Sequence, residues 1–99
     1  MKKARNANEA TLAKIESLTS DLRQIDLLDE RRLGVFYLDR KEVVHFHELP
    51  DAIVADLFLP SGRKRLPVTT RSEQLEVLDH IWDSVENVER RNSRKGRKI

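Results

Sequence analysis

The sequence predicts an α+β fold in which an antiparallel meander of three to four strands lies between an N-terminal and a C-terminal helix. Two observations lead to this prediction. The spacing of apolar residues changes from helical to alternating near Gly34, and it returns to the helical spacing after Thr70. Short turn-forming segments also separate the apolar runs between these two points, as in hairpins. A chain of 99 residues has room for one such domain.

The first predicted element is an amphipathic helix that begins at Glu9, with Asn8 as its N-cap. Its apolar residues recur at spacings of three and four over about four turns. Leu27 and Leu28 break this spacing, and Gly34 ends the segment. The stripe expected to face the core is Leu12, Ile15, Leu18, Leu22 and Ile25.

Strands are predicted wherever apolar and β-branched residues are bounded by turn residues. Pro67 cannot donate a hydrogen bond to a neighbouring strand, so the last strand should lie at the edge of the sheet. The intervening turns are expected at 39–41, 48–51 and 60–63. The predicted strands are 35–38, 43–47, 53–59 and 65–69.

The last predicted element is a helix that runs to about Arg91. It opens with a capping box, because Thr70 and Glu73 have the spacing at which each side chain can bind the other residue's amide. The spacing places Trp82 on the apolar stripe, so we expect it to be a core residue. The stripe is Leu75, Leu78, Trp82 and Val85, widened by Val77, Ile81 and Val88.

The turn positions predict the strand registers. A two-residue turn at Arg40–Lys41 pairs Phe36 with His45, and a four-residue turn at 48–51 pairs Val43 with Asp56. Side chains then alternate between two faces. The face expected to pack on the helices holds Val35, Tyr37, Val44, Phe46, Ile53, Ala55 and Leu57. The other holds Phe36, Leu38, Val43, Val54 and Phe58, together with His45, His47 and Asp56.

Three titratable groups on this second face are the candidate binding site: His45, His47 and Asp56. Two imidazoles and a carboxylate can hold a divalent metal ion and leave positions open for water. The same groups can act as a base with its orienting acid, or can simply hydrogen-bond on a partly buried face. His80, on the last helix, is a further candidate neighbour. No cofactor is expected from the sequence, except that a divalent metal could bind at these residues.

Charge is distributed unevenly along the chain. Both ends are basic, whereas residues 6–89 hold 10 bases and 17 acids. We therefore expect a basic N-terminal arm at 1–7, one α+β domain at 8–91 and a disordered basic tail at 92–99. The tail either binds nucleic acid or an acidic protein, or only keeps the chain soluble. Its candidate residues are Arg90, Arg91, Arg94, Lys95, Arg97 and Lys98.

The sequence lacks the residues that several classes of function require. The chain has no cysteine, which excludes disulfides, zinc–thiolate sites and cysteine nucleophiles. It has no apolar run long enough to cross a bilayer and no secretory signal, so we expect a cytoplasmic protein without a membrane partner. Ser61 to Lys64 could contact a phosphate, but this segment has the pattern of a hairpin turn. No motif predicts an enzyme class.

Three short segments resemble the small bacterial luciferase-domain family over residues 34–88. They are His45-Phe46-His47, Ala55-Asp56 with apolar neighbours ending in Pro60, and Arg71-Ser72-Glu73 at the start of the last helix. The chain departs from that family in having Val44 where a glycine is usual and a shorter stretch between Pro60 and Thr70. The resemblance implies an α+β fold and points to His45, His47 and Asp56. It does not imply light emission, because most such small proteins have no assigned activity.

Three functions remain open at this stage. Small size, absent motifs and an apolar second sheet face favour a non-enzymatic interaction or regulatory domain that forms a homodimer through that face. The alternative is a ligand- or metal-binding protein, with or without catalysis, that uses His45, His47 and Asp56. The third is nucleic-acid binding through the basic tail.

Overall fold

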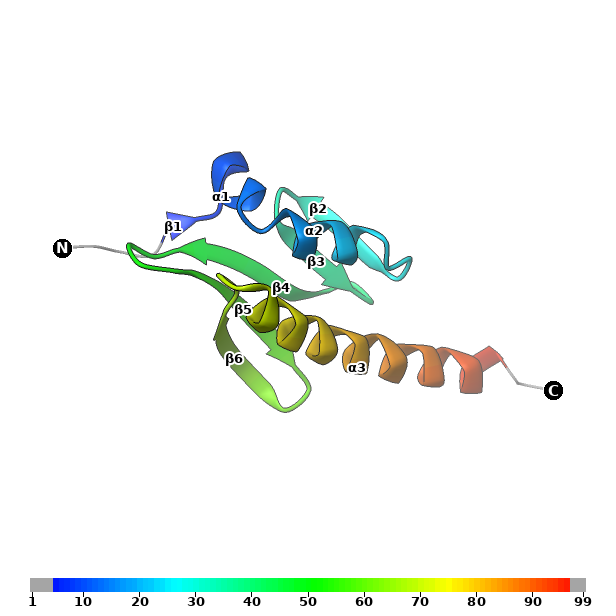
Figure 1. The fold of residues 1–99 in the computed structure, drawn as a ribbon. Coiled ribbons are helices and arrows are strands. Elements are labelled where there is room, and N and C mark those ends of the chain that lie inside the picture. Colours follow the sequence, from blue (N-terminus) through cyan, green and yellow to red (C-terminus); the bar gives the residue numbers. More distant parts are fainter. Residues whose placement is uncertain (1–4, 97–99) are drawn as a thin grey trace.

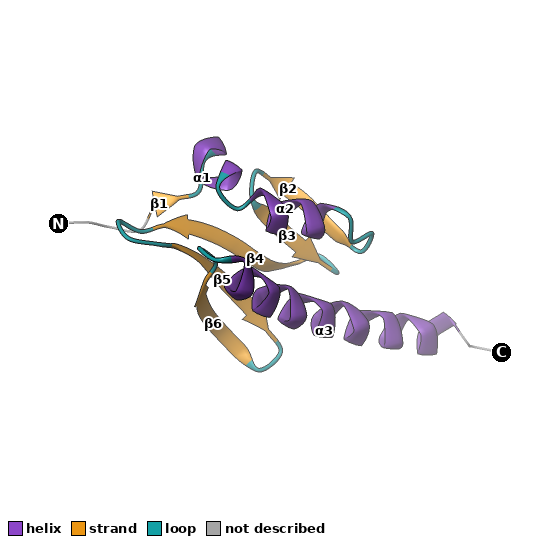
Figure 2. Ribbon diagram, in the orientation of Figure 1, coloured by secondary structure: helices purple, strands orange, loops and turns teal. Residues whose placement is uncertain are grey.

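A computed structural model describes residues 5–96 and the side chains of residues 7–92 (Figure 1). All three helices contribute to one core against a single antiparallel sheet, which confirms the predicted α+β meander (Figure 2). The helices are α1 (Glu9–Ala13), α2 (Glu16–Arg23) and α3 (Arg71–Gly96). The strands are β1 (Arg5–Asn6), β2 (Leu28–Arg32), β3 (Val35–Leu38), β4 (Lys41–Glu48), β5 (Ile53–Leu59) and β6 (Gly62–Pro67).

The main path of the sheet runs in the order β2-β3-β4-β5-β6, and β1 pairs with β4 beside this path. The strand that contains Pro67 is therefore at an edge, as predicted. The sheet has two strands more than the sequence indicated, β1 and β2. In β2 the residues are mostly charged and do not alternate, so only its pairing with β3 makes it a strand.

The N-terminal helix begins as predicted but divides into two. The Asn8 side chain accepts a hydrogen bond of 2.9 Å from the Thr11 amide, which caps α1. At Ile15 the backbone leaves the helical region, with φ −122° and ψ 33°, and α2 starts at the next residue. The five residues of the predicted stripe are nevertheless all buried in the core.

The C-terminal helix also starts at its predicted capping box. The Thr70 amide donates to Glu73 at 2.9 Å, and the Glu73 amide donates to the Thr70 hydroxyl at 3.2 Å. The helix continues to Gly96, beyond the predicted end.

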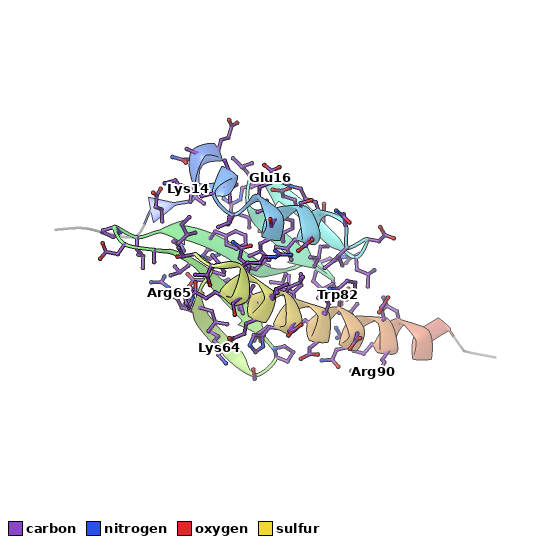
Figure 3. All side chains as sticks on the ribbon, viewed as in Figure 1. Lys14, Glu16, Lys64, Arg65, Trp82 and Arg90 are labelled. Carbon is purple, nitrogen blue, oxygen red and sulfur yellow. The ribbon has the colours of Figure 1, made fainter. Side chains whose placement is uncertain are left out.

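The buried stripe of α3 differs from the predicted one. Trp82, midway along α3 (Figure 3), is 42% exposed, so the prediction that it is a core residue is wrong. The broad apolar sector of this helix does not fit completely against the sheet, and the helix is rotated so that its β-branched residues face the core. Leu75 is exposed for the same reason. The buried apolar residues are Val77, Ile81, Val85 and Val88.

The β3–β4 hairpin turns one residue earlier than predicted. Asp39 and Arg40 both have positive φ, 53° and 71°, and Leu38 pairs with Lys41. A two-residue turn of this hand matches the twist of the flanking strands. The register then shifts between Phe36 and Tyr37, so Phe36 pairs with Val44 and not with His45. An extra residue in β4 therefore reverses the faces that simple alternation assigned to the residues of β3.

The reversal moves apolar side chains from the second face into the core. The sequence placed Phe36, Leu38 and Val43 beside the histidines, and this is wrong because all three are buried in the core cluster. Val35, expected in the core, is paired with His45 and only half-buried. Tyr37, two residues further along β3, is also half-buried on that face. The face opposite the helices is thus less apolar than predicted.

The β4–β5 hairpin is shifted by two residues from the predicted register. The Leu49 amide donates to the Ala52 carbonyl at 2.7 Å, and the strands pair so that His45 lies opposite Asp56. The predicted pairing of Val43 with Asp56 is therefore wrong. A shift of two residues preserves the alternation. His45 and Asp56 still share a face, as predicted.

Candidate metal centre

The candidate site lies where β4, β5 and β6 pair, on the face turned away from the core. Asp56 is the central residue because it pairs with His45 on one side and with Arg65 on the other. His47 follows His45 by two residues and therefore points to the same face. The histidine side chains are 21% and 16% exposed, and the Asp56 side chain is 7% exposed. The site is thus enclosed by its own residues but accessible from solvent.

Both imidazoles converge on one oxygen of Asp56. Nε2 of His45 is 3.2 Å from Asp56 Oδ2, and Nε2 of His47 is 3.0 Å from the same atom. The two rings are perpendicular, with their centroids 4.5 Å apart. One potential ligand atom from each of the three residues lies within 4.8 Å of the others. The structure therefore brings together all three residues that the sequence selected.

Glu42 determines which nitrogen of His45 carries a proton. Its Oε2 is hydrogen-bonded to His45 Nδ1, and an ionised carboxylate can only accept, so Nδ1 is the donor. A neutral His45 ring then directs the lone pair of Nε2 at the Asp56 oxygen. Nε2 is therefore the nitrogen of His45 that could serve as a metal ligand, with the other nitrogen held by a carboxylate.

His47 has a different environment at its second nitrogen. Its Nδ1 is the one buried side-chain nitrogen or oxygen without a hydrogen-bond partner among the side chains described. Such an atom costs about 1–3 kcal/mol, and in native proteins it often marks a functional group. Nε2, the nitrogen that faces Asp56, is therefore the atom through which the His47 ring makes its polar contact.

Arg65 is a second partner of Asp56, and it was not among the predicted site residues. Its Nε donates to Oδ1 at 2.7 Å and its terminal nitrogen donates to Oδ2 at 3.0 Å. These hydrogen bonds lower the pKa of Asp56 by more than burial raises it, and the nearby histidines lower it further. They also raise the pKa of Arg65. Asp56 is therefore ionised, as a metal ligand must be.

An aromatic side chain extends the site along β5. The ring of Phe58 lies 5.3 Å from the ring of His45, and the guanidinium of Arg63 lies 5.2 Å from the centre of the Phe58 ring. Neither Glu42 nor Arg63 was predicted to belong to the site. Glu42 lies on the same strand as His45 and reaches it through the irregularity in β4, whereas Arg63 reaches the site through its pairing with Phe58.

Other predicted residues lie elsewhere. His80 is on α3 and does not belong to the group of possible ligands. Of the six candidates for nucleic-acid binding, Arg90 is hydrogen-bonded to Asn87 and Arg91 is 3.5 Å from Asp39. Arg94 and Lys95 lie in the last turn of α3, and Arg97 and Lys98 lie outside the described residues.

No protein-family model, curated protein or solved structure matches this chain. The resemblance to the luciferase-domain family therefore stays a prediction. Within the described part of the chain, none of the helices combines the length and the apolar character needed to cross a bilayer. The geometry around Asp56 is thus the main evidence on function.

Proposed function

We propose that this chain is a small domain that binds a divalent transition-metal ion through His45, His47 and Asp56. The observation that carries the proposal is the convergence of two imidazole nitrogens on one carboxylate oxygen, at 3.2 and 3.0 Å. Ligand atoms bound to one ion at about 2.1 Å are themselves roughly 3.0–3.4 Å apart at octahedral or tetrahedral angles. The two nitrogen–oxygen separations therefore suit a shared ion.

The surroundings support the same chemistry. Two imidazoles and one carboxylate favour zinc, nickel or iron(II) over calcium or magnesium, and three protein ligands leave coordination positions open. Glu42 stands in the position of the carboxylate that orients a metal-bound histidine by accepting from its other nitrogen.

Two other functions have less support from the geometry. Homodimerisation through the second sheet face was expected from its apolar side chains, but Phe36, Leu38 and Val43 belong to the core. Of the basic residues predicted to bind nucleic acid, Arg90 is engaged by Asn87 and Arg91 by Asp39. A homodimer and a cytoplasmic location stay predictions of the sequence.

Calorimetric titration with nickel, zinc and manganese tests the proposal. We expect the full chain to bind one nickel or zinc ion per molecule and to bind manganese more weakly. His45→Ala and His47→Ala should each abolish binding, because two ligands do not hold the ion. His80→Ala is the matched control, since it removes an imidazole on the other side of the molecule, and it should bind like the wild type.

Two results would contradict the proposal. One is the absence of heat with all three metals in a protein that is folded by circular dichroism. The other is equal binding by the wild type and His45→Ala. Sedimentation of the same samples shows whether the chain is a dimer, and a dimer weakened by His45→Ala without metal would favour an interface instead.

A further inference from the structure

Charge around the candidate metal centre is balanced before any metal binds. Asp56 and Glu42 contribute two carboxylates, whereas Arg65 and Arg63 contribute two guanidinium groups. With neutral imidazoles the cluster has no net charge. A divalent ion would leave an excess of two positive charges in a partly enclosed site, where uncompensated charge is costly.

Arg65 is the group that a metal ion would disturb. Its terminal nitrogen donates to Asp56 Oδ2, the oxygen that both histidines also face. An ion bound to that oxygen would repel the guanidinium strongly at this short distance. The Arg65 side chain is 49% exposed and lies on an edge strand, as Figure 3 shows, so it can turn towards solvent without breaking the fold.

A second guanidinium lies beside it. Arg63 and Arg65 are two residues apart on β6, and their partners Phe58 and Asp56 share a face of the sheet. A hollow of about 160 Å³ is lined by Asp56, Arg63, Lys64 and Arg65. Several water molecules fit in such a volume. Paired guanidinium groups bind oxyanions through planar sets of donors, and this hollow includes Asp56, the central residue of the candidate metal centre.

We propose that the metal centre also binds a phosphate group, held by Arg63 and by the Arg65 side chain that the metal displaces from Asp56. This inference rests on the proposed metal binding. A doubly charged phosphate compensates the excess charge and fills a coordination position of the ion. The phosphate is either inorganic or the end of a phosphate monoester. Metal and phosphate should therefore each strengthen the binding of the other by the same factor.

Nickel titrations of the full chain with and without phosphate test the inference. We expect inorganic phosphate or phenyl phosphate to tighten nickel binding about fivefold or more. The anion that gives the larger effect identifies the source of the phosphate group. Arg63→Gln should bind nickel alone like the wild type and lose most of the enhancement. Arg65→Gln should bind nickel alone more tightly, because a competitor for Asp56 is gone, and should also lose enhancement.

Arg90→Gln is the matched control, because it makes the same chemical change at an exposed residue of α3 that does not line the hollow. It should keep the full enhancement. If neither anion tightens nickel binding, the proposed phosphate site is wrong, whereas the proposed metal binding still stands. An equal loss in Arg90→Gln and Arg63→Gln also overturns it, since general surface charge then explains the effect. Absence of nickel binding in every variant overturns both proposals, and melting curves confirm that each variant is folded.

Discussion

Replacing Asp56 with asparagine should lower the stability of the metal-free protein. The change keeps the shape of the side chain but removes the charge that accepts two hydrogen bonds from Arg65 and faces two imidazoles. Hydrogen bonds to charged groups contribute about 1.5–3 kcal/mol. The asparagine oxygen still accepts a hydrogen bond and keeps part of this stabilisation. Arg65 is half-exposed, so water can hydrate its guanidinium in the variant. We therefore expect a loss of roughly 1–2 kcal/mol.

Thermal unfolding followed by circular dichroism, in buffer with a chelator, measures this loss. For a domain of this size each kcal/mol corresponds to about 4–8 °C, so Asp56→Asn should melt roughly 4–16 °C below the wild type. Asp51→Asn makes the same chemical change at an exposed turn and should alter stability by less than about 0.5 kcal/mol. Arg65→Gln combined with Asp56→Asn should cost less than the sum of the single changes. Equal melting of Asp56→Asn and wild type would refute the view that Asp56 organises this face.

Three further predictions concern the helices and the β2–β3 hairpin. Ile81→Ala should lower the free energy of unfolding by about 2–5 kcal/mol, because Ile81 is fully buried, and Trp82→Ala should lower it by less. Chemical denaturation measures both values, and a larger loss in Trp82→Ala would place Trp82 in the core. Thr70→Ala should cost about 0.5–2 kcal/mol by removing the helix cap, and an unchanged melting curve would contradict this. Two hydrogen bonds from Arg23 lower the pKa of Glu30, so this carboxylate stabilises the fold above the pKa of the unfolded chain and loses that effect as pH falls through its folded value. Glu30→Gln should thus have a lower free energy of unfolding than the wild type at pH 7, and the difference between the two proteins should become smaller below about pH 4. A difference that becomes larger at low pH would contradict this linkage.

The sequence by itself determined the helix starts and the class of fold. Asn8 caps α1, and Thr70 with Glu73 caps α3, because these contacts form between residues three apart and need no tertiary structure. The five apolar residues of the N-terminal stripe were identified for a similar reason, since a 3.6-residue period places them on one side of any helix. Such local signals are complete within one segment of the chain.

Part of the site could also be predicted locally. His45 and His47 share a face at any register, because alternation has a period of two. Asp56 was placed on their face even though the predicted β4–β5 register was wrong, since the error was an even number of residues. The three possible ligands were thus predicted, although their contacts through one oxygen were not.

Only the tertiary structure decided what surrounds them. The register shift in the β3–β4 hairpin moved Phe36 and Leu38 into the core, and no residue pattern signals such a shift in advance. Arg65 joined the site because β6 pairs with β5 in a register that places it opposite Asp56. Glu42 joined it because the irregularity in β4 brings its side chain to His45, three residues away on the same strand. The exposure of Trp82 likewise depends on how α3 is rotated against the sheet. A sequence pattern specifies which side chains can share a face, whereas the balance of packing and pairing over the whole fold selects which of them meet.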